Sequence, residues 1–371
     1  MTVEEIDSVF EPESKAVENA RCILYLALKN ARDGAMFYNK DTKRIVCKVG
    51  GEWKNLVTEE TEIKNIENNM KKESLTSLNN NGCKRIVLVD APGQTCNRFW
   101  AYLDSVAWAI ANNRKVVILH WDSSIQYYDA LRKNTHVSFP FYLQNAISVI
   151  GERSWKCLLL RFFNNRITNR FYRTNLAHRI GFFQSWPLRK SHDYFPKLKE
   201  KLKPIFRPNE DICMHVENTM KKYKSEGYFV IGVHIRRGDY KNWEGGRYFY
   251  ELSDYADTMR SLTLLYKDKQ VAFFISTNEQ YDEKVFSGLT LCRFNNKTAA
   301  HDLHTLSLCD RIIGPLSTFS RWASWYGDVP LAFIEKEQID MKESDFSIIH
   351  DFYHFDNGNE IVNLSDKVQT L

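Results

Sequence analysis

The stretch YFVIGVHIRRGDY, residues 228–240, changes character halfway along. Its first half is an unbroken apolar run rich in β-branched residues, the pattern of a strand buried on both faces of a parallel sheet. Its second half places His234, Arg236, Arg237 and Asp239 at the carboxyl end of that strand, where open α/β sheets bind their ligands. The stretch therefore predicts an α/β fold with a ligand site at this strand end.

Two adjacent arginines at such a strand end need anionic partners, because buried charge is costly unless it is paired. Phosphate is one such partner, since a guanidinium group grips it with two parallel hydrogen bonds. The residues alone leave a second interpretation open: Arg236 and Arg237 form internal salt bridges, and His234 is a satisfied core histidine. The Arg237-Gly238-Asp239 tripeptide also matches an adhesion motif, but a buried strand leads into it and nothing indicates secretion.

The composition is that of a soluble globular protein of two domains: 371 residues, 43% hydrophobic and 26% charged. Its eight cysteines contain no Cys-x-x-Cys spacing, which is typical of reduced, mostly buried thiols in a cytosolic protein. The amino terminus, residues 1–15, is acidic and lacks an apolar signal core, and the apolar run at residues 22–28 is too short to span a bilayer. We therefore expect a cytoplasmic protein.

The net charge of +5 is unevenly distributed. Residues 153–203 contain thirteen Lys or Arg against two acidic residues, Asp193 and Glu200. Such a basic, aromatic-rich segment suits contact with phospholipid headgroups or nucleic acid. The alternative, which the sequence favours, is a solvated helix face together with a wall of a nucleotide cleft.

An earlier part of the chain predicts a second α/β unit. Residues 85–89 read as a strand, residues 97–112 as an amphipathic helix and residues 115–120 as the next strand. The loop between the first strand and the helix holds a single glycine, Gly93, so the dinucleotide-binding fingerprint is absent. Before it, residues 35–57 predict a small β-meander, residues 14–30 predict a helix, and residues 58–81 predict a charged helix followed by a linker.

Residues 299–326 combine a short helix, the strand 311–314 and a Ser-Thr turn that opens another helix. Hydroxyls and free amides at a helix amino terminus suit a diphosphate, although Ser317 and Thr318 are also ordinary N-cap residues. His301 and His304 have spacing that suggests a metal pair, but no third ligand lies nearby in the sequence.

Four elements together resemble the α-1,2-fucosyltransferases, glycosyltransferase family 11, within the superfamily that uses GDP-fucose. They lie in the family's order: residues 93–98, residues 181–195 with Gly-Phe-Phe-Gln-Ser, residues 233–240 with His-x-Arg-Arg-x-Asp-Tyr, and residues 302–322. The resemblance implies a GT-B-like architecture of two Rossmann-like domains facing a cleft. The predicted parts are an α+β extension (1–81), an acceptor-side domain (82–207), a GDP-fucose-binding domain (208–345) and a C-terminal tail (346–371).

The implied reaction is the transfer of L-fucose from GDP-fucose to a glycan hydroxyl, α-1,2 to galactose, with inversion. No cofactor or metal is implied, and the arginines take over the stabilisation of the departing diphosphate. Arg236 and Asp239 are the predicted catalytic residues, with Asp239 acting as a base or bracing an arginine. The predicted GDP-fucose contacts are His234, Arg236, Arg237, Asp302, Ser317, Thr318, Phe319, Gly93, Gln94 and Asn97. The predicted acceptor contacts are Gln184, Ser185, Trp243 and Arg247.

The predicted partners are GDP-fucose and an oligosaccharide or glycan acceptor, without nucleic acid. Contact of residues 153–203 with the inner face of a membrane is a further expectation. Two other functions stay open at this point. One is a protein O-fucosyltransferase or another GDP-sugar transferase on the same fold. The other is a non-catalytic module that binds lipid or nucleic acid through the basic segment.

Overall fold

The computed structural model describes residues 36–39, 44–49, 52–57, 75, 84–142, 151–335 and 340–361. The chain divides into two compact units, residues 1–73 with 367–371 and residues 74–366. The helix predicted at residues 14–30 lies outside the described residues, and so do the helix and linker predicted at residues 58–81, apart from Leu75.

The smaller unit contains an antiparallel three-stranded sheet in the order β1-β2-β3. Its strands are β1 (Met36–Asn39), β2 (Arg44–Val49) and β3 (Glu52–Val57). The predicted β-meander is confirmed.

The first half of the larger unit is built on a parallel sheet in the order β6-β5-β4-β7. Its strands are β4 (Arg85–Leu88), β5 (Lys115–Ile118), β6 (Val137–Ser138) and β7 (Phe182–Phe183). The chain leaves β4 toward β5 and later returns to the other side of β4 as β7. The sheet therefore has a topological switch point between β4 and β7.

The helices of this half are α5 (Thr95–Ala111), η1 (Ser123–Tyr127), α6 (Asp129–Arg132), α8 (Glu152–Phe163), α9 (Arg166–Tyr172), α10 (Asn175–Arg179), α11 (Ser185–Leu188), η2 (Phe195–Leu198) and α12 (Lys199–Leu202). Between α10 and α11 the chain forms the short strand β7, Phe182 and Phe183. These two residues pair with Val87 and Leu88 and complete the edge of the sheet.

The second half holds a parallel sheet in the order β11-β10-β8-β9. Its strands are β8 (Tyr228–Ile235), β9 (Gln270–Thr277), β10 (Arg311–Gly314) and β11 (Leu331–Phe333). Its helices are α13 (Glu210–Ser225), η3 (Gly238–Lys241), η4 (Trp243–Gly246), α14 (Leu252–Leu265), η5 (Glu283–Phe286), α15 (Ala299–Leu306), α16 (Thr318–Gly327) and η6 (Glu343–Asp345). The switch point of this sheet lies between β8 and β10. The predicted α/β class, with two Rossmann-like halves, is confirmed.

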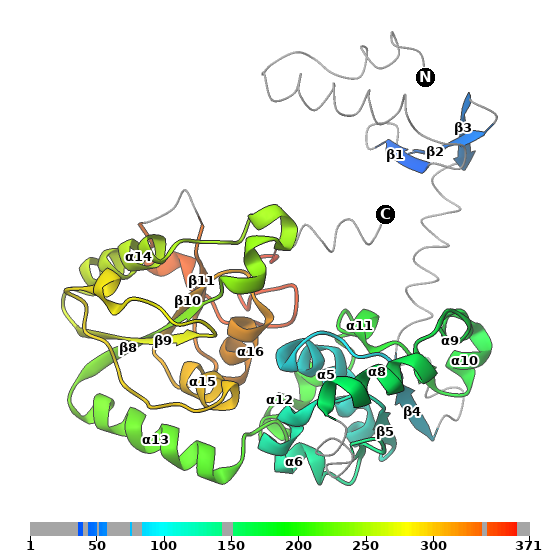
Figure 1. Ribbon diagram of the computed structural model, residues 1–371, viewed down its shortest axis with the longest axis horizontal. Helices are drawn as coiled ribbons and strands as arrows, with labels where there is room; N and C mark the ends of the chain where they lie inside the picture. The colour runs from blue at the N-terminus through cyan, green and yellow to red at the C-terminus, as the bar shows by residue number, and fades with distance from the viewer. Residues whose placement is uncertain are drawn as a thin grey trace. The chain divides into compact units, whose positions relative to one another are not determined.

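Strand β8 is buried from Val230 to Ile235, as its apolar sequence predicts. Val230 belongs to the core on the α15 side, whereas Ile231 and Val233 belong to the core on the α14 side. Figure 1 shows α14 and α15 on opposite sides of β8 and β9. Gly232 allows α15 to approach, because a Cβ atom there would lie 2.5 Å from Leu306 Cδ2.

The two halves share one aromatic core, formed where α5 packs against α16. The ring of Phe99 lies 4.7 Å from that of Trp322, and the ring of Trp100 lies 5.4 Å from that of Trp322. Ile349 and Phe352 also belong to this core, so residues of the predicted C-terminal tail are part of the folded unit. Among the described helices, no candidate for crossing a membrane is found.

Candidate functional site

The carboxyl end of β8 carries His234 in a buried position, with 4% of its surface exposed. Burial, and secondly the charge of Arg236, lowers the pKa of His234 to about 3, so the imidazole stays neutral at physiological pH. Its ring lies 5.0 Å from the ring of Phe319, and its Nδ1 atom has no hydrogen-bond partner among the described residues. His234 is therefore not the fully satisfied core histidine of the alternative interpretation.

Arg236 connects the two halves of the unit. Its Nε and Nη2 atoms donate to the two carboxylate oxygens of Asp239 at 2.7 and 2.8 Å, and its Nη1 atom donates to Gln94 Oε1 at 3.2 Å. These bonds use three of the five N–H groups of the guanidinium, which leaves two for a ligand. Asp239 is held on both oxygens, and its pairing with Arg236 lowers its pKa. The geometry therefore favours a bracing role for Asp239 over a role as a base.

Arg237 has a different partner. Its Nη2 atom donates to Glu251 Oε2 at 2.7 Å, and its guanidinium lies 5.1 Å from the ring of Phe249. The internal salt bridges of the alternative interpretation are thus present at both arginines. Their carboxylate partners, Asp239 and Glu251, are 58% and 61% exposed. Ion pairs this exposed are worth only about 0–1 kcal/mol, and they leave other N–H groups of both guanidinium groups free to bind a phosphate.

The amino ends of α5 and α16 meet beside Arg236. Thr318 Oγ1 donates to Asn97 Oδ1 at 2.7 Å, and Trp100 Nε1 donates to the Thr318 carbonyl at 3.4 Å. Ser317 caps α16 by accepting from the Phe319 amide at 3.2 Å. Neither helix carries an acidic residue in its first turn, so the positive ends of both dipoles are uncompensated.

Gly93 is required by the local geometry of this meeting point. It has a φ of +34°, and a Cβ atom there would lie 2.0 Å from Asn97 Nδ2. Predicted donor-site residues from both halves, Gln94 and Asn97 on one side and Arg236 and Thr318 on the other, are thus brought together at one place.

A cavity of about 320 Å³ opens at the carboxyl end of β9 and includes Asp302 in its lining. Burial raises the pKa of Asp302, and its two oxygens accept from Ser276 Oγ at 3.1 Å and Asn296 Nδ2 at 2.8 Å. The Oδ1 atom of Asn296 is buried without a partner in the described part of the chain. Ser276 and Asn296 were not predicted from the sequence. The only signal for Ser276 is the change from apolar to polar residues at the end of β9.

The four predicted acceptor residues fall into two separate places. Trp243 lies 4.7 Å, ring to ring, from Tyr240, and Arg247 packs over Tyr248, so both belong to the loop that follows Arg236. Gln184 and Ser185 instead follow β7. Gln184 donates to Asn169 at 3.3 Å.

Ser185 has a structural position rather than one that an acceptor can reach. It is fully buried, and its amide and hydroxyl both donate to Asp90 Oδ1 at 2.6 Å. The Trp186 amide donates to the other oxygen of Asp90 at 2.9 Å. Asp90 therefore fixes the start of α11, and a sugar finds no exposed surface on Ser185.

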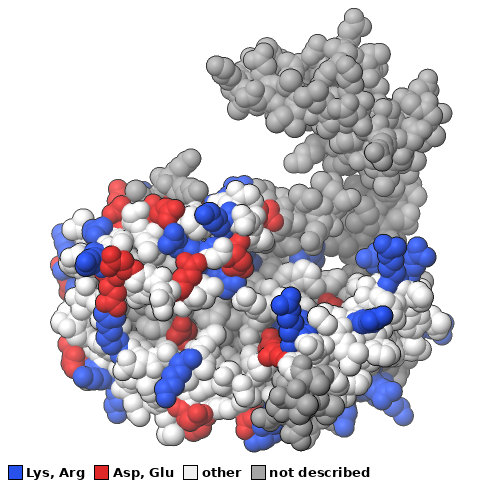
Figure 2. Space-filling model, viewed as in Figure 1, with Lys and Arg blue, Asp and Glu red and all other residues white. Residues whose placement is uncertain are grey.

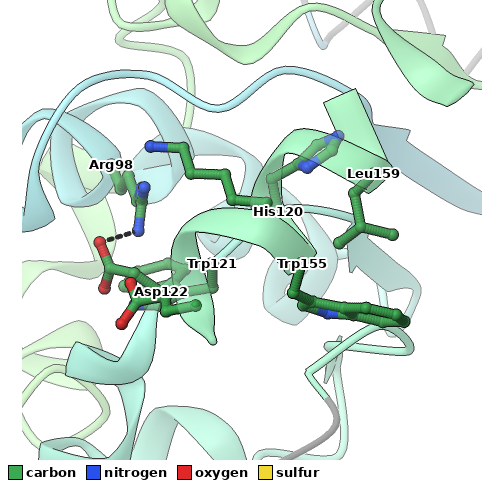
Figure 3. A pocket seen from close by; sticks show the side chains of 8 residues that line it. Arg98, His120, Trp121, Asp122, Trp155 and Leu159 are labelled. Carbon is green, nitrogen blue, oxygen red and sulfur yellow. Dashed lines mark ion pairs between the residues drawn. The ribbon is translucent and has the colours of Figure 1, made fainter. Parts of the chain in front are cut away.

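Arg98, the last residue of the motif at residues 93–98, lines a small cavity in the first half (Figure 3). Its side chain is 1% exposed and forms an ion pair with Asp122. The cavity measures about 10 Å³, room for a single water molecule. Burial, followed by the charges of Arg98 and Lys156, lowers the pKa of the neighbouring His120 to about 4. These residues form an internal polar cluster and not a sugar site.

Comparison with known proteins assigns this chain to a family. The model of glycosyl transferase family 11 matches residues 140–342, more than half of the chain, so the chain belongs to this family. It is a glycosyltransferase. No curated protein matches the chain in sequence.

Solved structures similar to this chain include three fucosyltransferases. A mutant of Arabidopsis thaliana FUT1 in complex with GDP is 14% identical, with a TM-score of 0.46 over 81% of this chain and 86% of that one. Fucosyltransferase NodZ from Bradyrhizobium is 18% identical, with a TM-score of 0.41 over 68% and 96%. POFUT1 in complex with GDP is 12% identical, with a TM-score of 0.41 over 67% and 98%.

The neutral state of His234 predicts a pH dependence of stability. Its pKa is about 3 in the folded chain and near 6.5 in the unfolded chain, so the unfolded state binds the proton more readily. Stability is therefore complete above pH 6.5 and falls as the pH drops toward 3, by up to about tenfold in the unfolding equilibrium per pH unit. Urea unfolding between pH 7 and 4 should show a steeper loss for the wild type than for His234→Gln.

The control is His350→Gln, which changes an exposed histidine and should keep the wild-type slope. Equal slopes for the wild type and His234→Gln would contradict the buried, neutral imidazole.

Proposed function

We propose that this glycosyltransferase moves L-fucose from GDP-fucose to a glycan hydroxyl, α-1,2 to galactose, with inversion and without a metal or cofactor. The observation that carries the proposal is the position of Arg236: at the end of β8, bonded to Gln94 of the other half, and next to the uncompensated amino end of α16. The positive charge of Arg236 and the positive amino ends of α5 and α16 converge there, which is what a departing diphosphate requires.

The chemical step breaks the bond between fucose C1 and the β-phosphate oxygen while the acceptor oxygen attacks the opposite face of C1. Negative charge grows on the diphosphate as this bond breaks. A guanidinium already fixed by Asp239 and Gln94 stabilises that charge without reorganisation, and such stabilisation is commonly the largest catalytic contribution. The acceptor hydroxyl releases its proton to water as its oxygen bonds to C1, because both oxygens of Asp239 are already held by Arg236.

The guanine base fits the cavity at the end of β9. A buried carboxylate at Asp302 accepts from the N1 and N2 hydrogens of guanine, while the free Oδ1 atom of Asn296 offers a further acceptor. The cavity volume of about 320 Å³ lies within the range of small-molecule sites. The same cavity accommodates the guanine of any GDP-sugar, so a comparison of GDP-fucose with GDP-mannose tests the choice of donor sugar.

Replacement of Arg236 tests the diphosphate assignment. Arg236→Ala should lower transfer by at least about 10²- to 10³-fold and weaken GDP binding measured by calorimetry, because the developing charge loses its guanidinium. Arg237→Lys should also be impaired, since an ammonium group cannot make the forked contact. GDP, GDP-fucose and GDP-mannose are compared in the same titrations.

The matched control is Arg260→Ala, which removes another arginine paired with an aspartate three residues away, here Asp257 on α14. It should retain wild-type turnover. Unchanged turnover in Arg236→Ala would rule out the assignment, and turnover of GDP-mannose in place of GDP-fucose would point to another GDP-sugar transferase.

Chelation tests the metal-free chemistry. Transfer at 25 °C should be unchanged by excess EDTA, because arginine and helix dipoles supply the positive charge. The measurement is an initial-rate assay with and without EDTA, and recovery of a lost rate by Mg²⁺ or Mn²⁺ would contradict the proposal.

A specific observation also supports membrane contact through residues 153–203. Large apolar side chains on α8, α9 and α10 are exposed: Phe162 to 67%, Ile167 to 81% and Leu176 to 61%. Four exposed arginines accompany them on the same helices, Arg161, Arg166, Arg170 and Arg179, and a fifth, Arg173, directly follows α9. Figure 2 shows Lys and Arg side chains gathered on the part of the surface where α9 and α10 lie. Apolar side chains among cations suit an anionic bilayer surface.

Vesicle binding tests this surface. The chain should co-sediment with phosphatidylserine-containing vesicles more than with phosphatidylcholine vesicles, and Phe162→Ser combined with Ile167→Ser should weaken binding about tenfold. Leu264→Ser, which changes a leucine of α14 that is 75% exposed, is the control and should bind normally. No preference for anionic vesicles, or salt-sensitive RNA binding instead, would contradict the assignment. The cytoplasmic location stays a prediction.

A further inference from the structure

Two histidines and a buried aspartate meet at a place that the transfer reaction does not use. His192 lies in the loop after α11, and Asp351 and His354 lie in the C-terminal segment. One ligand atom from each lies within 4.8 Å of the others. His354 Nδ1 is 3.0 and 3.1 Å from the two Asp351 oxygens, and His192 Nε2 is 3.8 Å from Asp351 Oδ2.

The Asp351 carboxylate is fixed by its own turn. Ile349 and Phe355 pair across an antiparallel bridge, which closes a tight hairpin around residues 350–354. Asp351 Oδ1 accepts from the backbone amides of Tyr353 at 2.7 Å and His354 at 3.0 Å. Among the contacts made by described residues, Oδ2 faces only the two histidine rings. One oxygen therefore holds the turn while the other is presented to the cluster.

The donor set matches a particular class of cation. Two imidazole nitrogens and one carboxylate oxygen are ligands typical of Zn²⁺, with water completing a fourth position. Ligand atoms on one Zn²⁺ ion lie about 3–3.5 Å apart, so small rotations of the two histidines are sufficient. Both rings are open to solvent, with 31% of His192 and 45% of His354 exposed, while Asp351 is 6% exposed. An ion can therefore enter and bind a buried carboxylate.

A second cluster in the described residues consists of Cys213, Glu217 and His304, and it is not open to a cation. The guanidinium of Arg207 already occupies it, donating to Cys213 Sγ at 3.2 Å and to Glu217 Oε1 at 3.1 Å. A positive charge in that position opposes a cation. Of the two clusters, the one formed by His192, Asp351 and His354 is therefore the better candidate for a metal site.

We propose that His192, Asp351 and His354 form a structural Zn²⁺ site that fastens the C-terminal hairpin to the first half. The hairpin already touches both halves. The Phe352 ring lies 5.7 Å from the ring of Trp100 on α5, and the Phe352 carbonyl accepts from Arg321 Nη1 of α16 at 2.8 Å. A bound ion reinforces this connection and takes no part in fucose transfer.

The test uses the full chain without a polyhistidine tag, freed of metal by chelation and dialysis. Titration with Zn²⁺, followed by calorimetry and elemental analysis, should give one ion per chain. Zn²⁺ at about a hundred times its dissociation constant should raise the thermal midpoint by about 5 °C. Co²⁺ should bind at the same place and produce visible absorption bands, whereas Mg²⁺ should do neither.

The variants His192→Ala and His354→Ala should each weaken Zn²⁺ binding at least tenfold and remove the thermal shift. His350→Ala is the matched control, because it removes an exposed histidine of the same hairpin that is outside the cluster. If either cluster variant fails to fold, Asp351→Asn, which keeps the oxygen that holds the turn, should show the same weakening. Binding that survives in the double variant of His192 and His354, or the absence of a Zn²⁺-dependent shift in the wild type, would overturn the proposal.

Discussion

The guanidinium of Arg236 is the constraint on which the site depends. A single side chain at the end of β8 is held by Asp239 in its own half and by Gln94 in the other half. This arrangement places the guanidinium beside the point where the amino ends of α5 and α16 meet. The ion pair itself contributes little stability, because Asp239 is largely exposed. The ion pair instead orients the Arg236 guanidinium, which must stay in place when negative charge develops on the diphosphate beside it.

The apolar side of the same junction supplies the stability that the polar side lacks. The tryptophans and phenylalanines between α5 and α16 form one continuous core across both halves, and the C-terminal hairpin adds Phe352 to it. Burial of large aromatic side chains is worth far more than exposed ion pairs. The polar residues of the site therefore remain available for a ligand, while packing holds the two halves together.

Much of this arrangement was accessible from the sequence. The apolar run ending in His-x-Arg-Arg predicted β8 and its charged end, and the pattern at residues 299–326 predicted α15, β10 and α16 in order. The strands β6 and β7 were not predicted, because two residues are too few to show a period.

The three-residue spacing of Arg236 and Asp239 made their pairing foreseeable. The contact of Arg236 with Gln94, 142 residues away in sequence, depends on the tertiary fold. The same holds for Asp90, whose role is visible only through Ser185 and Trp186.

The most direct test of the central claim is a crystal structure of the chain with GDP bound. Arg236 is expected to place two N–H groups about 2.7–2.9 Å from oxygens of the β-phosphate, with that phosphate against the amino end of α16. A structure in which Arg236 stays on Asp239 alone and the diphosphate is held by other residues would contradict it.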